Sequence, residues 1–208
     1  AGALDVMGQY YSVASSSHAF YNYGGLVYTG NDEKALFDNM WQKCYAVIAC
    51  CNTIIEKCDE NKAGLSPVWK GSIKGEALAL RAMLHFDMLR LFGPLTSELD
   101  KESIPYQTNS DQTVTPLLSG SEVVGLILDD LKNAVGLLKD TDPYFVEEEF
   151  SDTDLNYRRF RMNYFAAKGL MARVQLWGGD KEKAAATAKE VIAEGQAEGA
   201  EFFPFVTN

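Results

Sequence analysis

The chain has 208 residues, of which 47% are hydrophobic and 23% charged, and its net charge is −10. This is an ordinary globular composition, and the chain is long enough to bury a sizeable core. The acidic balance argues against a nucleic-acid surface and against docking to anionic lipid, because both need clustered Lys and Arg. No apolar run approaches the ~20 residues of a membrane-spanning helix. No signal peptide is visible, so the chain is either cytosolic or expressed with a targeting segment upstream of Ala1.

Residues 1–32 form an irregular segment with an unusual density of aromatic side chains. The rings belong to Tyr10, Tyr11, Phe20, Tyr21, Tyr23 and Tyr28, and Asn22 and Asn31 are interleaved with them. Aromatic rings cover the flat apolar faces of sugars, while amide and charged groups bond the hydroxyl rim. Two interpretations stay open for each ring: it covers the end of a helix, or it contacts a ligand.

A helix is predicted over residues 33–59, and its apolar stripe is spaced as a helix requires. Trp41, Tyr45, Ile48, Asn52 and Ile55 follow one another at intervals of three or four residues. We interpret Trp41 and Tyr45 as packing residues.

All four cysteines, Cys44, Cys50, Cys51 and Cys58, lie in this helix. Seven helical residues rise about 10.5 Å, too far for a disulfide between Cys44, Cys51 and Cys58, and the spacing fits no zinc site. They are predicted to be free thiols acting as small hydrophobes.

The next predicted helix, 67–92, ends at a Gly-Pro and contains "GEALALRAMLHFDMLRLFGPL", residues 75–95. Its polar residues fall on two narrow lines of the helical wheel. Glu76, Asp87 and Arg90 share one line, and Arg81 and His85 lie on roughly the opposite side. Because an unpaired buried charge is costly, we expect Arg81, Asp87 and Arg90 to be largely buried and paired.

The remaining chain is predicted to hold three helices, over 121–138, 162–177 and 180–193, separated by two long insertions. The polar connection 94–118 contains three prolines, and Ser119 or Ser121 caps the helix that follows it. The acidic loop 140–160 contains "DTDLN", residues 152–156, with the first spacings of a calcium loop. Tyr157 and Asn163 stand where such a loop needs Gly and Glu, so no metal site is predicted.

These elements predict an all-α fold, an irregular tetratricopeptide-like array of antiparallel helix pairs with long loop insertions. Residues 163–196 form a helix, a short turn and a helix, and have the 34-residue length of one tetratricopeptide unit. Small side chains, such as Ala166, Ala172 and Ala188, allow the two helices to approach closely. We expect one helical domain over 1–208, with helical repeats over 33–195.

Catalysis is not predicted, because the residues for it are absent from the sequence. There are only two histidines, His18 and His85, and no HExxH, GxSxG, P-loop or GxGxxG motif. Glu76 and Asp87 share one helix with about 16 Å of rise between them, too far apart for the carboxylate pair of a glycosidase. No catalytic residue, cofactor or metal is therefore assigned.

The stretch "GEALALRAMLHFDMLRLFGPL" resembles the signature helix of SusD/RagB-like proteins, and the neighbouring blocks agree in order. These blocks are "WQKCYAVIACCN", "IPY", "EVVGLILDDLKNAVGLL" and "RMNYFAAKGLMARVQLWGGDKEKAAATAKEVI". The resemblance covers about residues 33–195 and assigns a structural signature to Trp41, Tyr45, Asn52, Glu76, Arg81, Asp87 and Arg90. Family members are usually much longer, so their C-terminal half is apparently missing here.

The resemblance implies a non-enzymatic surface lipoprotein of Bacteroidetes-type outer membranes that binds glycans above a TonB-dependent transporter barrel. The signal peptide and lipidated Cys would then lie upstream of Ala1. The residues that we expect to contact a glycan are Tyr21, Asn22, Tyr23, Tyr28 and Asn31, with Tyr21, Tyr23 or Tyr28 presenting a face to solvent. The alternative is a helical-repeat scaffold for protein–protein contacts that binds no ligand. The sequence does not name the sugar.

Overall fold

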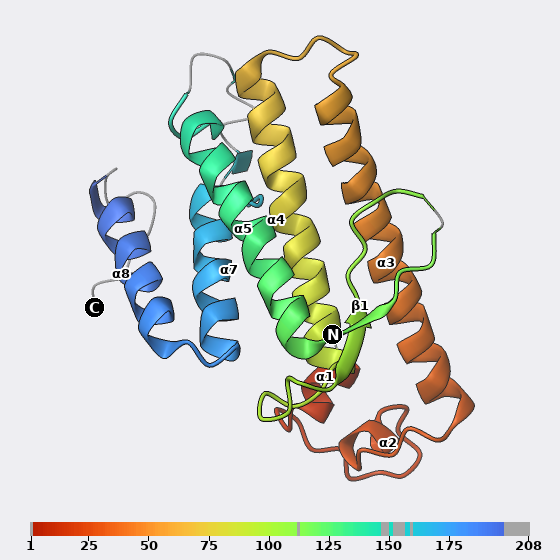
Figure 1. The fold of residues 1–208 in the computed structure, drawn as a ribbon. Coiled ribbons are helices and arrows are strands. Elements are labelled where there is room, and N and C mark those ends of the chain that lie inside the picture. The colour runs from red at the N-terminus through yellow and green to blue at the C-terminus, as the bar shows by residue number, and fades with distance from the viewer. Residues whose placement is uncertain (1, 112, 147–149, 152–156, 159, 198–208) are drawn as a thin grey trace. The chain divides into compact units, whose positions relative to one another are not determined.

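The structure is a computed structural model that describes residues 2–111, 113–146, 150–151, 157–158 and 160–197 (Figure 1). Its contacts gather into two compact units, residues 1–45 and 46–208. The elements are α1 (Gly2–Met7), α2 (Tyr21–Gly24), α3 (Asn31–Glu60), α4 (Pro67–Phe92), β1 (Glu102–Pro105), β2 (Leu117–Ser119), α5 (Gly120–Thr141), α7 (Tyr164–Trp177) and α8 (Lys181–Ala197). The long predicted helices are thus confirmed to within a few residues, and the expectation of one domain over 1–208 stays a prediction.

The first unit contains α1, α2 and the beginning of α3 around a small core of its own. Ala3, Val6 and Tyr23 are buried at its centre. Partly buried hydrophobic side chains pack against them: Met7, Val13, Phe20, Tyr28, Leu36 and Phe37. The segment 1–32, which the sequence analysis leaves irregular, therefore holds two short helices.

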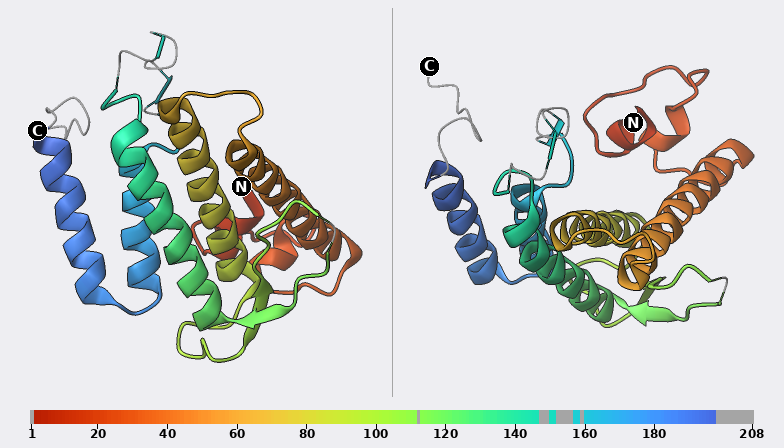
Figure 2. Two further views of the ribbon diagram at one scale, coloured as in Figure 1. Left: turned by 45° about the horizontal axis from the view of Figure 1, so that its top comes forward. Right: turned by 90° about the horizontal axis from the view of Figure 1, so that it is seen from above.

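The second unit is an array of helices that run alternately in opposite directions. Figures 1 and 2 show α4, α5, α7 and α8 side by side, each antiparallel to the one before it. Its core is made of fully buried side chains, among them Met88, Leu89, Ile127, Leu131, Leu138 and Val174. The predicted all-α array of antiparallel pairs is confirmed.

Local chemistry sets where these helices begin. The Ser66 side chain accepts a hydrogen bond from the backbone N–H of Trp69, and Pro67 occupies the first turn of α4. Ser119, rather than Ser121, caps α5 and forms a capping box with Glu122. The Asn163 side chain accepts from the backbone N–H of Ala166 at the start of α7, and Asp180 accepts from the N–H of Lys183 at the start of α8.

Helices α4 and α5 approach so closely that α4 needs glycines where they meet. A Cβ on Gly75 would lie 2.8 Å from Cγ of Leu138 and 3.3 Å from the carbonyl oxygen of Ala134. A Cβ on Gly71 would lie 2.5 Å from a methyl group of Thr141. The "GEAL" at the start of the signature stretch therefore owes its Gly to helix packing.

A two-stranded sheet lies in the connection between α4 and α5, where the sequence analysis expects only a loop. Strands β1 and β2 pair antiparallel, with Glu102 opposite Ser119 and Pro105 opposite Leu117. Ile104, a residue of β1, is fully buried. Within the described residues, no helix combines the length and hydrophobicity needed to cross a membrane.

Candidate functional site

The first unit presents aromatic side chains on a core that is itself aromatic. Phe37 meets the ring of Tyr23 at 6.4 Å and that of Tyr28 at 5.3 Å between centroids, both edge to face. Phe20 meets Tyr23 at 6.0 Å in the same manner. Edge-to-face contacts of this kind hold rings in fixed orientations. The inner rings of the segment are thus packing residues.

Other rings of the same unit face solvent. Tyr10 is 80% exposed, Tyr11 67% and Tyr21 43%, and Leu26 and Val27 beside α2 are exposed as well. The turn after α1 positions the first pair: Gln9 has a left-handed backbone with φ of 62°, and a carbon of the Tyr10 ring lies 3.0 Å from the position of a Cβ on Gly8. Exposed aromatic side chains gathered on one small unit are what a stacking ligand requires.

The structure separates the predicted glycan-contacting residues into exposed and covered ones. Tyr21, Asn22 and Asn31 are exposed, with Asn31 at the first position of α3. Asn22 is already bonded, because its side chain donates to Oε1 of Glu33 at 2.8 Å. Tyr28 is half-buried against Phe37.

Of Tyr21, Tyr23 and Tyr28, it is Tyr21 that presents a face to solvent, whereas Tyr23, expected to contact the glycan, is covered, since only 4% of the residue is exposed. It fills the core of the first unit instead. Sequence reasoning noticed Tyr10 and Tyr11 in the aromatic segment but did not select them. The signal that could have done so is their position directly after the Gly8-Gln9 turn, where α1 ends.

In the second unit, the signature residue Arg81 is the centre of a buried polar cluster. Its guanidinium donates to both carboxylate oxygens of Asp130 at 2.7 Å, and to Oδ1 of Asn52 at 2.8 Å. Tyr106 donates its hydroxyl to the same carboxylate at 2.7 Å. Burial acts to lower the pKa of Arg81, but the hydrogen bonds and charge of Asp130 outweigh it and raise the pKa.

His85 extends the Arg81 cluster to the chain after β1. The His85 ring stacks on Tyr106 with 3.9 Å between centroids, and its Nε2 accepts from the backbone N–H of Gln107 at 3.1 Å. That bond requires a neutral imidazole, whose Nδ1–H then donates to the carbonyl of Arg81 at 3.0 Å. Burial lowers the pKa of His85 to about 4, consistent with this neutral form. His85 is therefore a structural residue.

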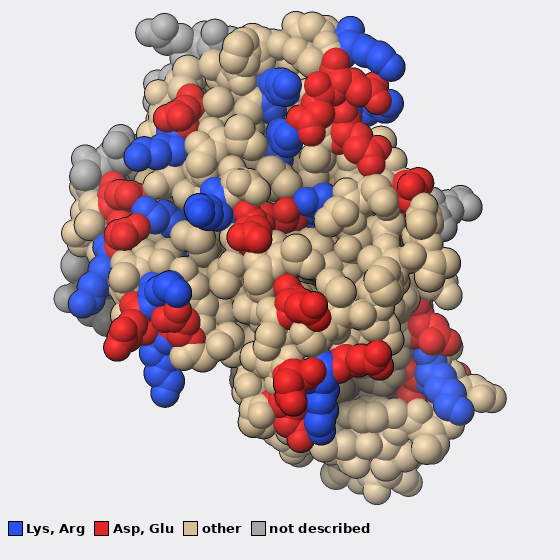
Figure 3. Space-filling view, viewed as in Figure 1, with Lys and Arg blue, Asp and Glu red and all other residues tan. Residues whose placement is uncertain are grey.

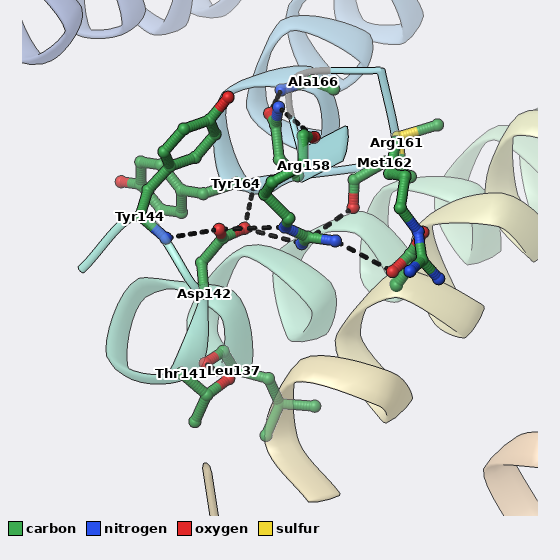
Figure 4. A network of polar contacts seen from close by, with 11 residues as sticks. Leu137, Thr141, Asp142, Tyr144, Arg158, Arg161, Met162, Tyr164 and Ala166 are labelled. Atoms are coloured by element: carbon green, nitrogen blue, oxygen red, sulfur yellow. Dashed lines mark hydrogen bonds and ion pairs between the residues drawn. The ribbon is translucent and has the colours of Figure 1, made fainter. Parts of the chain in front are cut away.

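A second polar cluster joins α4, α5 and the start of α7 (Figure 4). Asp142 is fully buried and accepts from Nε and Nη2 of Arg158 at 3.0 and 2.7 Å, and from the backbone N–H of Tyr164 at 2.8 Å. Arg158 and Arg161 both turn to Glu76, at 2.9 and 3.0 Å. Glu76 from one polar line of α4 and Arg81 and His85 from the other thus belong to two separate clusters, and both clusters hold helices together.

For Asp87 and Arg90 the expectation of burial is wrong, although they do pair with each other. Their side chains are 40% and 41% exposed. They lie on the last turns of α4, where no covering segment comparable to the one over Glu76 is present among the described residues. Arg90 also lies over the ring of Phe86, 5.0 Å from its centroid.

The other singled-out residues behave as packing residues. The rings of Trp41 and Tyr45 lie against each other, tilted by 35° with 4.8 Å between centroids, and both residues are half-buried. All four cysteines are free; Cys51 and Cys58 are buried, and burial raises the pKa of both thiols. A protonated thiol is a weak nucleophile. The "DTDLN" stretch lies outside the described residues.

The surface carries charges of both signs. Figure 3 shows basic and acidic side chains next to one another over most of the face in view, with acidic side chains gathered most densely at its upper right. No group of His, Cys, Asp and Glu suited to a metal ion occurs among the residues that the structure describes. The two arrangements that the described chain offers for recognition are thus the exposed rings of the first unit and the cavities between helices of the second.

Comparison with known proteins shows where the chain belongs. A profile of the SusD-like family, described as "Starch-binding associating with outer membrane", matches residues 5–176. A SusD-like protein of Formosa agariphila is 28% identical over 158 residues, covering 75% of this chain and 26% of that protein. A SusD-like protein of Bacteroides ovatus is 30% identical over 146 residues, covering 68% and 23%. This chain thus spans about a quarter of the length of these curated relatives.

The fold agrees with that assignment. A candidate sugar-binding protein of Bacteroides vulgatus superposes with a TM-score of 0.68 and 25% identity, covering 89% of this chain and 38% of that one. The family profile extends from α1 through most of α7. The residues it matches therefore include Arg81 and Asp142, the centres of the two polar clusters. The chain belongs to the SusD-like family.

Proposed function

We propose that this chain is part of a non-enzymatic protein that binds glycans at the cell surface for uptake. The observation that carries the proposal is the exposure of three tyrosines of the first unit, Tyr10, Tyr11 and Tyr21. The family description, starch-binding and associated with the outer membrane, supports the ligand class.

The physical reasoning starts from how a ring binds a sugar. A ring that stacks on a sugar must be uncovered, yet it must be held by a rigid support so that little entropy is lost on binding. Tyr21 meets both conditions, since it opens α2 while Tyr23, two residues later, anchors α2 in the core. Tyr10 and Tyr11 follow α1, which is anchored by Ala3 and Val6.

The resemblance to the family also leads us to propose how the protein is anchored and which transporter it acts with. The protein would be lipid-anchored in the outer membrane through a Cys upstream of this chain, and would act with a TonB-dependent transporter barrel. The relatives from Formosa agariphila and Bacteroides ovatus support a Bacteroidetes-type setting. Nucleic acid is not proposed as a partner, given the net charge of −10.

The test is a titration with maltoheptaose, chosen for the family's description, followed by β-glucan, xylan and pectin oligosaccharides. We expect one class to bind, and Tyr10→Ala and Tyr11→Ala to weaken it about tenfold each, the effect of losing one stacked ring. The control is Tyr157→Ala, which removes another exposed ring that lies in the second unit. Failure of all of these glycans to bind would favour the alternative, a scaffold for protein–protein contacts.

A further inference from the structure

A cavity of about 700 Å³ lies between α3, α4 and α5, and all the residues that line it belong to the second unit. This volume falls within the range of small-molecule sites. Its apolar wall is formed by Ile55, Leu78 and Leu137, one residue from each helix. Its polar residues are Lys74, Arg81, Asp130, Lys132 and Asn133.

The lining is basic although the protein is acidic. Three basic residues and one acidic residue line the cavity, in a chain whose net charge is −10. Asp130 is neutralised by Arg81, and both are nearly buried. Lys74 pairs with Asp59, whose side chain is 54% exposed, and such a pair in contact with solvent exchanges partners at little cost.

Two side chains that line the cavity are hydrogen-bond donors free to bind a ligand. They belong to Lys132 and Asn133, which are exposed and have no hydrogen bond or ion pair within the described residues. An ammonium and an amide beside an apolar wall match a ligand that has an anionic group, hydroxyl groups and an apolar face. A neutral sugar would offer no negative charge to balance the lysines that line the cavity.

Gly136 lines this cavity without a side chain to fill it. Gly136 lies inside α5, where glycine costs about 1 kcal/mol relative to alanine, and a Cβ there would meet nothing within 4 Å. Packing against a neighbour, which explains Gly75, does not explain Gly136. A side chain at Gly136 would enter the cavity that this residue lines.

We propose that this cavity binds a uronate unit of an acidic oligosaccharide, with Lys132 binding its carboxylate and Asn133 its hydroxyl groups. The inference rests on the proposed glycan binding and narrows its ligand class, with lining residues that are other than the tyrosines. Arg81 and Asp130 keep their pairing and are the lining residues with the least exposed charged groups.

The test compares trigalacturonate with its methyl-esterified form, which has the same sugar skeleton without the charge. Binding to the whole chain is measured by calorimetry. We expect at least tenfold tighter binding of the acid, about the value of one charge-assisted hydrogen bond. Lys132→Gln should remove that preference, whereas Lys139→Gln, an exposed lysine of α5 that does not line the cavity, should keep it.

The second variant tests the location of the site. Gly136→Leu fills the cavity and should reduce trigalacturonate binding at least tenfold, whereas Gly125→Leu places the same side chain at an equally open position of α5 outside it. Three results would overturn the proposal. They are equal binding of trigalacturonate and its ester, no binding of trigalacturonate, and undiminished trigalacturonate binding by Lys132→Gln. If neutral glycans bind and only Tyr10→Ala or Tyr11→Ala weakens them, the proposed function stands and this inference fails.

Discussion

Arg81 and Asp130, 49 residues apart in sequence, form a two-pronged ion pair in the interior of the second unit. Both hydrogen bonds are 2.7 Å long, and the side chains are 7% and 10% exposed. The pair fastens α4 to α5, and Asn52 and the carbonyl of Thr108 connect the same guanidinium to α3 and to the chain after β1. One side chain thus joins four segments of the array.

Replacing Arg81 with Ala should lower the free energy of unfolding by about 3–5 kcal/mol, because Asp130 would remain buried without its partner charge. Arg90→Ala is the matched control on the same helix. Its pair with Asp87 is exposed to solvent, so the loss should stay below about 1 kcal/mol. Denaturant melts of both variants give the comparison, and equal losses would show that burial of the pair does not matter.

His85 should make the protein less stable in mild acid. Its folded pKa of about 4 lies below the unfolded value of 6.5, so the unfolded chain takes up the proton first. The stability is complete above pH 6.5 and falls as the pH drops toward 4, by about 3 kcal/mol for a shift of this size. His85→Gln should lose this part of the pH dependence, while His18→Gln should keep it. Identical pH profiles for parent and His85→Gln would contradict the structure.

Tyr23→Ala should unfold the first unit rather than reduce ligand contact. Truncating a buried aromatic residue costs about 3–5 kcal/mol, and Tyr23 is 4% exposed in the centre of a small core. Tyr21→Ala, two positions away and 43% exposed, should change stability by about 0.5 kcal/mol or less. Limited proteolysis within residues 1–45 distinguishes them, and resistance of the Tyr23 variant equal to that of the parent would be the contrary result.

Asp142→Ala should destabilise the junction between α5 and α7. The carboxylate has no exposed surface and accepts from Arg158 and from the N–H groups of Tyr144 and Tyr164. Its removal leaves Arg158 with Glu76 as its remaining carboxylate partner and takes the acceptor from the N–H groups of Tyr144 and Tyr164, at a cost of about 1–3 kcal/mol. Asp140→Ala, two residues earlier and exposed, is the control. Hydrogen exchange at the start of α7 should accelerate only in the Asp142 variant.

The long helices could be predicted because their signals are local. Ser66-Pro67, the Ser119–Glu122 box and Asp180 mark helix starts by chemistry within one turn. Strands β1 and β2 were not predicted, because "ESIP" and "LLS" are too short to show an alternating pattern. Their pairing also depends on residues about 15 positions apart in the sequence. The register of such a pair is set by tertiary contacts.

The candidate site was less predictable, because exposure depends on what packs on a residue from far along the chain. The wheel placed Arg81 and Glu76 on separate lines correctly, but it could not show that Arg158 covers Glu76 while Asp87 and Arg90 stay open. In the aromatic segment, residues 1–32, no periodic spacing distinguishes the buried aromatic residues from the exposed ones. Tyr23 is buried through contacts with Phe20 and Phe37 that the local sequence does not reveal.

A glycan that stacks on the exposed tyrosines of the first unit should be visible by NMR. NOEs are measured between the ring protons of selectively labelled Tyr residues and the C–H protons of whichever oligosaccharide of the titration panel binds. We expect NOEs to Tyr10 or Tyr11 that disappear in Tyr10→Ala and Tyr11→Ala, with none to the buried Tyr23. A bound glycan that shows no NOE to Tyr10, Tyr11 or Tyr21 and keeps its affinity in these variants would contradict the proposal.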